Sequence, residues 1–194
     1  MKPFSARILL LAAALFVLFS CNKKQPQSSS QIQQGPDVVA AHDVNAVAGI
    51  RWTRPERWGM GPARQMRIAT YDIPASEGDA EGGECAIFYF GSGQGGDISA
   101  NIGRWAEQFE NGQPEQSSKD VNGMKVTLVK IAGTYLAPGG PMMQSTGKKD
   151  NYRLLGAIVE APEGSVFFKL TGPSKTVVAC ESEFDNLVGS ISKQ

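Results

Sequence analysis

Six consecutive residues in the middle of the chain have the spacing of a phosphate-binding loop. They are Gly91, Ser92, Gly93, Gln94, Gly95 and Gly96, whose first, third and sixth positions fit the pattern G-x-G-x-x-G. Between a strand and a helix, such a loop can present backbone N–H groups to a phosphate. The next residue, Asp97, would place a negative charge where the phosphate should lie. We therefore interpret the segment as a tight, exposed connection and as a candidate ligand loop.

Two of the three cysteines lie in the part of the chain that we expect to fold, Cys85 and Cys180. In an oxidising compartment this pair would form a disulfide if the segment carrying Cys180 packs over the strand carrying Cys85. Two buried free cysteines are the alternative. Because the sequence has no C-x-x-C, it supports neither a redox motif nor a cysteine-based zinc site.

Other arrangements that could perform catalysis are scarce. His42 is the only histidine and lies in a segment with little to pack, so a Ser-His-Asp or Cys-His mechanism has no base within the predicted domain. Acidic residues gather near one loop, which we interpret as a solvated surface; a glycosidase-like or calcium site is the alternative. We predict no catalytic residue, no metal and no cofactor. The grouped acidic residues are Asp72, Asp79, Glu81 and Glu84.

Three tryptophans, Trp52, Trp58 and Trp105, could line a groove. We expect Trp105 to lie in the core, because it belongs to an apolar stripe at helical spacing. Trp52 and Trp58 lie in turn-rich segments, and we expect them to cover an edge of a sheet.

The N-terminus has the order of an export signal. Residues 1–20 place Lys2 and Arg7 before a run of twelve apolar residues, which is shorter than the roughly 20 that a permanent membrane span needs. The run ends in Leu18-Phe19-Ser20-Cys21, which resembles the lipobox of bacterial lipoproteins. The resemblance implies that Cys21 is lipidated and becomes the first residue of a membrane-anchored protein. The alternatives are a plain secretory signal and a cytoplasmic protein with an apolar N-terminal helix.

The segment after the cysteine predicts a tether. Residues 21–48 are rich in Gln, Ser and Pro at their start, which is typical of a flexible linker. In Gram-negative lipoproteins an aspartate after the cysteine favours inner-membrane retention. This chain has Asn22, so the resemblance favours the periplasmic side of the outer membrane.

The rest of the 194-residue chain, residues 49–194, has the length of one globular domain. The whole chain is 41% hydrophobic and 20% charged with a formal net charge of zero, which is the composition of an ordinary globular protein. Without a basic excess, no nucleic acid partner is expected.

Hydrophobic periodicity predicts strands, helices and loops in the domain. Asp97 is predicted to cap a helix of about 13 residues, and residues 173–192 are predicted to form a closing amphipathic helix. Residues 162–164 form a compact turn, 111–119 a polar loop and 136–151 a long exposed loop. The predicted strands are residues 50–52, 64–73, 84–90, 123–135 (with a bend at Gly133), 152–161 and 165–171.

Two helices among six strands are too few for a doubly wound parallel sheet. We therefore predict an α+β fold with a mostly antiparallel sheet and two main amphipathic helices. A strand pair followed by T-G-P and F-x-x-L-V-x-S, within residues 171–190, resembles the PsbP/Mog1-like α/β/α sandwich in element order over residues 50–192. The resemblance implies an assembly factor or binding module more often than an enzyme.

Together these features predict a membrane-anchored extracytoplasmic lipoprotein that is a non-enzymatic binding or envelope-assembly module. Its partner would be an envelope protein or a small ligand, contacted through residues 91–96 and 136–151. The alternative is an envelope enzyme that uses carboxylates or a metal, which would need a deep pocket with convergent acidic groups. A purely structural lipoprotein would have neither feature.

Overall fold

The computed structural model describes residues 45–137 and 147–194. The predicted signal peptide, the lipidation site Cys21, His42 and the tether up to residue 44 lie outside the described residues. Residues 138–146, in the middle of the predicted long loop, also lie outside them.

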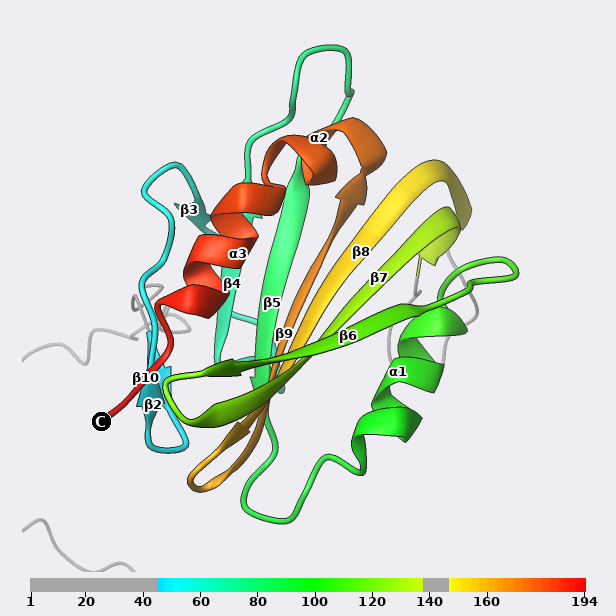
Figure 1. Ribbon diagram of the computed structural model, residues 1–194. Helices are drawn as coiled ribbons and strands as arrows, with labels where there is room; N and C mark the ends of the chain where they lie inside the picture. The colour runs from blue at the N-terminus through cyan, green and yellow to red at the C-terminus, as the bar shows by residue number, and fades with distance from the viewer. Residues whose placement is uncertain (1–44, 138–146) are drawn as a thin grey trace, which may run out of the picture. The chain divides into compact units, whose positions relative to one another are not determined.

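A seven-stranded antiparallel sheet organises the domain (Figure 1). Its order is β3-β4-β5-β9-β8-β7-β6, and every neighbouring pair is antiparallel. This arrangement confirms the predicted α+β class with a mostly antiparallel sheet. In spatial order the strands are Gly59–Met60, Ala69–Ile73, Gly83–Tyr89, Gly164–Pro173, Gly147–Ala161, Met124–Ala137 and Glu115–Val121.

A second, three-stranded sheet joins the two ends of the described domain. In it β2 (Ile50–Arg51) lies between β1 (Ala46–Val47) and β10 (Ser192–Lys193), and both pairings are antiparallel. Ala48, which connects β1 to β2, is buried in the core. The last residues of the predicted tether therefore belong to the fold.

The three helices are α1 (Ile98–Ala106), α2 (Ser174–Ala179) and α3 (Glu181–Gly189). The predicted cap of α1 is confirmed, because the Asp97 carboxylate accepts a hydrogen bond from Ala100 N at 2.7 Å. The helix is shorter than predicted, and Phe109 beyond it forms a β-bridge with Tyr135. The predicted closing helix is two helices, interrupted at Cys180, whose φ of −105° and ψ of 8° are not helical.

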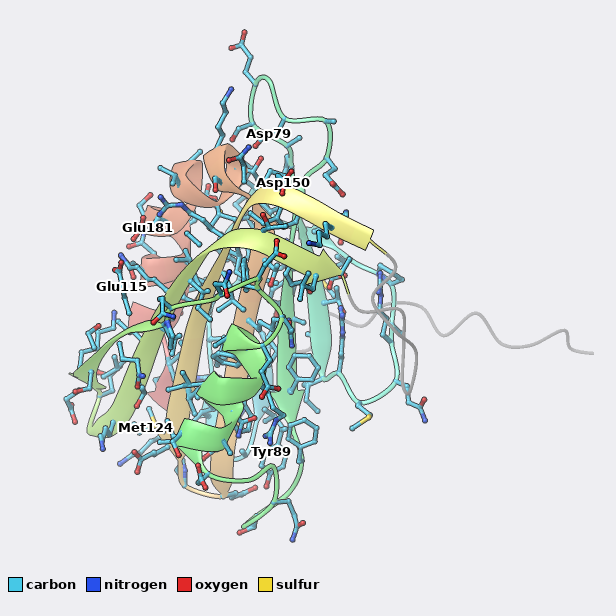
Figure 2. All side chains as sticks on the ribbon, turned by 90° about the vertical axis from the view of Figure 1, so that its right-hand side faces the viewer. Asp79, Tyr89, Glu115, Met124, Asp150 and Glu181 are labelled. Carbon is cyan, nitrogen blue, oxygen red and sulfur yellow. The ribbon has the colours of Figure 1, made fainter. Side chains whose placement is uncertain are left out.

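Helix α1 covers one face of the large sheet, and α2 and α3 cover the opposite face (Figure 2). Because side chains alternate along a strand, β8 serves both faces. Leu154 and Ile158 pack in one cluster with Trp105 of α1. Leu155 and Val159 pack in a second cluster with the side chains of α2 and α3. The domain therefore has the three α/β/α layers that the resemblance implied.

Two predicted loops are wrong in part, and both errors concern strands with polar side chains. Residues 115–121, mostly within the predicted polar loop, form the edge strand β6, which pairs with β7 along its length. Six of its seven side chains are not buried, so it lacks the apolar alternation that predicts a strand. The predicted long loop is shorter, because β7 extends to Ala137 and β8 begins at Gly147. The bend predicted at Gly133 coincides with a register shift between Gly133 and Tyr135.

Two tryptophans are placed differently from the prediction. Trp52 and Trp58 do not cover a sheet edge; both are buried in the cluster beneath α2 and α3. Their indole N–H groups donate to Tyr71 Oη at 2.9 Å and to Glu183 Oε2 at 2.8 Å. These partners are far away in sequence, so the turn-rich surroundings of each tryptophan give no sign of its burial. Trp105 lies in the core, as predicted.

Candidate functional site

A cavity of about 340 Å³ lies between α1 and the strands β5 and β9; we call it the α1 pocket. Its walls carry polar groups and aromatic rings from α1, β5 and β9 and from the residues that directly follow α1 and β5. The polar side chains are Asn101, Arg104, Gln108 and Lys169. The aromatic side chains are Phe88, Phe90, Trp105 and Phe167.

The polar side of the pocket begins on one face of α1. Asn101, Arg104 and Gln108 are spaced three and four residues apart, which places them along one side of a helix and its C-terminal turn. Sequence reasoning missed these residues, because polar positions on an amphipathic helix usually face solvent. The helical spacing of these three polar residues beside Trp105 was the sequence signal that could have identified them as pocket residues.

The glycine loop (residues 91–96) borders the pocket at one residue. Asn101 Nδ2 donates to Gly95 O at 2.9 Å, and Arg104 donates to the same carbonyl at 3.1 Å. A Cβ on Gly95 would lie 2.9 Å from the Phe90 ring and 3.2 Å from the Phe167 ring, and its φ is +90°. Glycine is therefore required where the loop passes these rings. The other candidate residues, Gly91, Ser92, Gly93, Gln94 and Gly96, do not line the pocket.

The phosphate interpretation of the glycine loop finds no support at the start of α1. The Asp97 carboxylate accepts hydrogen bonds from Ala100 N and Ser99 Oγ, both at 2.7 Å. The hydrogen bond from the Ala100 amide is the main cause of the lowered pKa of Asp97, and the bond from the Ser99 hydroxyl adds to it. A carboxylate of the protein itself therefore occupies the end of the helix that would attract a phosphate.

Lys169 is the ionisable group most altered by the pocket. Its ammonium donates to Gln108 Oε1 and lies 5.8 Å from the centre of the Tyr135 ring. No salt bridge of Lys169 occurs within residues 45–137 and 147–194. Burial first, and then the nearby charge of Arg67, lower the pKa of Lys169 to about 8, although the charge of Glu84 opposes them.

The predicted acidic group does not converge on one site. Glu84 pairs with Arg67 at 2.8 Å and with Arg64 at 3.3 Å, whereas Glu81 pairs with Lys149 at 2.6 Å. Asp72 is exposed. In the described part of the chain, no group of three or more His, Cys, Asp or Glu side chains is placed to hold a metal ion.

Asp79, the remaining acidic residue, holds the start of α2. Its Oδ2 accepts hydrogen bonds from Thr176 N at 2.9 Å and Thr176 Oγ1 at 2.7 Å. We expect Asp79→Ala to destabilise the domain by about 1 to 2 kcal/mol, because the Thr176 amide loses its partner. Urea denaturation of this variant beside Asp79→Asn, which keeps an acceptor, checks the expectation. Equal losses in the two variants would contradict it.

The two cysteines do not form the disulfide that we considered. Cys85 and Cys180 are both free and buried, which is the alternative that the sequence left open. The Cys180 thiol donates to Val177 O at 3.4 Å. Burial raises the pKa of Cys85 and raises the pKa of Cys180 to about 11. Both thiols are therefore protonated near neutral pH, and neither is an activated nucleophile.

A larger and more open hollow of about 800 Å³ lies between residues 53–57 and α3. Two charged residues that line it, Arg57 and Glu183, form an ion pair in which Arg57 donates to both carboxylate oxygens at 2.9 and 2.8 Å. The same carboxylate accepts the Trp58 indole N–H. This pair serves the packing of α3, and we therefore place the candidate site at the α1 pocket.

No helix among the described residues has the length and hydropathy of a membrane span.

The sequence matches no protein-family model and no curated protein. In three dimensions the chain is similar to the solution structure of cyanobacterial PsbP (CyanoP) from Synechocystis sp. PCC 6803. The TM-score is 0.47 at 10% sequence identity, and the match covers 80% of this chain and 99% of that chain.

Proposed function

We propose that this protein is a lipid-anchored extracytoplasmic binding module and that the α1 pocket holds a small ligand. The observation that carries the proposal is the pocket itself, where four aromatic rings meet a lysine that forms no salt bridge within residues 45–137 and 147–194. Small-ligand sites in proteins usually combine apolar walls with a few convergent polar groups. A volume of about 340 Å³ is near the lower end of such sites, which favours a small ligand over an envelope protein as the occupant.

The side chains of the pocket favour binding over the alternative of an envelope enzyme. An enzyme that uses carboxylates would need acidic groups in the pocket, but none of these residues lines it: Glu81 and Glu84 form salt bridges and Asp79 holds the start of α2. The groups that do line the pocket are amide, guanidinium and ammonium donors and aromatic rings. Such groups orient a ligand by hydrogen bonds and apolar contact.

The proposed anchor places the pocket close to a membrane. Lipid on Cys21 would hold the N-terminus, and the outer membrane is the proposed location in a Gram-negative cell. A flexible tether of about 25 residues has an r.m.s. length of roughly 25 to 30 Å. The domain could then meet ligands at the membrane surface while remaining attached to it.

The three tryptophans allow a direct test of binding. In a ¹⁵N-labelled domain, the indole N–H of Trp105 reports on the α1 pocket, whereas Trp52 and Trp58 lie on the other face of the sheet and serve as internal controls. A set of small acidic, basic and neutral aromatic fragments is titrated at millimolar concentration. We expect some fragments to shift the Trp105 signal alone, with the assignment checked in Trp105→Phe. If no fragment shifts it, or if all three signals move together, the proposed site is wrong.

A further inference from the structure

We propose that the α1 pocket selects a small aromatic carboxylate, with its ring against the phenylalanines and its carboxylate at Lys169. This inference rests on the proposed function, because it names the class of ligand that the same pocket takes. Three features of the pocket support it: an ammonium ion with no carboxylate partner in the described part of the chain, a positive surrounding charge and walls made of rings.

Among the described residues, the ammonium ion of Lys169 has no salt-bridge partner. Buried or partly buried charges in proteins are usually paired, because removing a charge from water is unfavourable. In the described part of the chain, Lys169 donates to the neutral amide oxygen of Gln108. An ammonium has three N–H donors, so two of them can serve a ligand. A carboxylate is the group that would both accept these hydrogen bonds and neutralise the charge.

The charges around Lys169 favour an anion over a cation. Arg104 lines the pocket from α1, and none of the described residues that line it is an Asp or a Glu. Arg67 and Arg64 hold Glu84, an acidic side chain whose charge acts on Lys169, in salt bridges at 2.8 and 3.3 Å. A cationic ligand would therefore meet two positive groups and no available carboxylate.

The walls of the pocket favour a ring over an alkyl chain. Phe90 and Phe167 have ring centres 5.8 Å apart at an interplanar angle of 57°, and Phe88 stacks on Phe90 at 6.1 Å and 15°. These separations suit aromatic pairing, to which a ligand ring would add. Phe90 is 37% exposed, an unusual state for a phenylalanine, so a ligand at this position would also cover apolar surface.

The affinity should depend on pH through Lys169. Its charged form binds the carboxylate, and burial lowers its pKa to about 8, so binding should weaken as pH rises through and beyond 8. Binding should also weaken in acid at about pH 4, where the carboxylate of the ligand is protonated. The other groups that face it are Arg67, Glu84, Arg104 and Tyr135. Arginine stays charged in this range, and burial raises the pKa of Tyr135 to about 12.

The test compares three probes that differ in one feature each. The first is 2-naphthoate, the second is its neutral isostere 2-naphthamide, and the third is octanoate, an anion without a ring. Each is titrated into the wild-type domain, and the Trp105 indole signal is followed. We expect 2-naphthoate to bind roughly ten- to hundredfold more tightly than 2-naphthamide, as a charge-assisted hydrogen bond would allow, and more tightly than octanoate.

Two variants separate the charge of Lys169 from its shape. Lys169→Met keeps an apolar stem and should bind 2-naphthoate and 2-naphthamide equally. Lys169→Arg keeps the charge, so its preference for 2-naphthoate should persist at pH 9.5, where the wild type loses it. Lys125→Met, at an exposed lysine paired with Glu160 at 3.6 Å, is the matched control and should behave as the wild type. Thermal melting confirms that every variant is folded.

The possible results separate this inference from the proposed function. Equal affinity of the wild type for 2-naphthoate and 2-naphthamide, or an unchanged preference in Lys169→Met, would overturn the inference. Tighter binding of octanoate than of 2-naphthoate would overturn the aromatic part. If only basic or neutral fragments shift Trp105, the inference is wrong and the binding module stands. If no fragment shifts Trp105, both are wrong.

Discussion

A Trp58→Ala variant is expected to lose about 3 to 5 kcal/mol of folding free energy. Trp58 is 0% exposed, and its ring lies 6.4 Å from that of Tyr71 in the cluster beneath α2 and α3. Its indole N–H also donates to Glu183 Oε2 at 2.8 Å. Alanine would leave a cavity and remove the hydrogen bond that fastens α3 to the segment around Trp58.

Urea denaturation followed by circular dichroism measures this loss. Trp58→Phe is the matched variant, because it keeps a ring and removes the N–H group, so it should lose less than Trp58→Ala. Since a domain of this kind has a total stability of about 5 to 15 kcal/mol, the alanine variant should lie near the limit of folding. A loss below about 1 kcal/mol would show that Trp58 covers a sheet edge, as its sequence context predicted.

The second large effect concerns the contact between α1 and the sheet. Gly156 on β8 lies directly under Trp105, and a Cβ added there would be 2.3 Å from Cζ3 of the indole ring. We expect Gly156→Ala to destabilise the domain by about 1 to 3 kcal/mol, because the ring and the helix that carries it must move outward. The same movement should alter the α1 pocket, which Trp105 lines.

Two further variants make the Gly156 prediction specific. Gly103→Ala, within α1, is the control, because a Cβ there would meet no atom within 4 Å and alanine favours helix. It should leave stability unchanged or raise it. In the double variant Gly156→Ala with Trp105→Ala, the clash disappears, so the two losses should not add. Additive losses would mean that Gly156 acts independently of the indole ring.

Much of the fold could be predicted from local sequence features. The cap at Asp97 lies directly before an apolar stripe, and the turn at residues 162–164 separates two apolar strands. Both signals depend on residues close in sequence, which is why they succeed. The break at Cys180 was missed because the apolar positions continue through it with helical spacing.

The candidate site was beyond prediction because it depends on strand order. The pocket exists because β5 pairs with β9, and this pairing places Phe88 beside Phe167 on the neighbouring strand. These residues are far apart along the chain, and no local pattern specifies that pairing. Lys169 illustrates the consequence, since a lysine within a strand is usually solvated, whereas here Gln108 and the ring of Tyr135 lie against its ammonium group. Of the glycine loop, Gly95 is the residue that lines the α1 pocket.

The membrane anchor is tested most directly by the intact mass and membrane fractionation of the full chain expressed beside Cys21→Ser in a bacterium that processes lipoproteins. We predict that the wild type begins at Cys21, carries the added mass of lipid and remains with the membranes. The Cys21→Ser variant should lack the lipid mass and appear in the soluble fraction, with the same thermal melting of its folded domain. A wild type without lipid that fractionates with the soluble proteins would contradict the anchor and leave the N-terminal segment as an ordinary export signal.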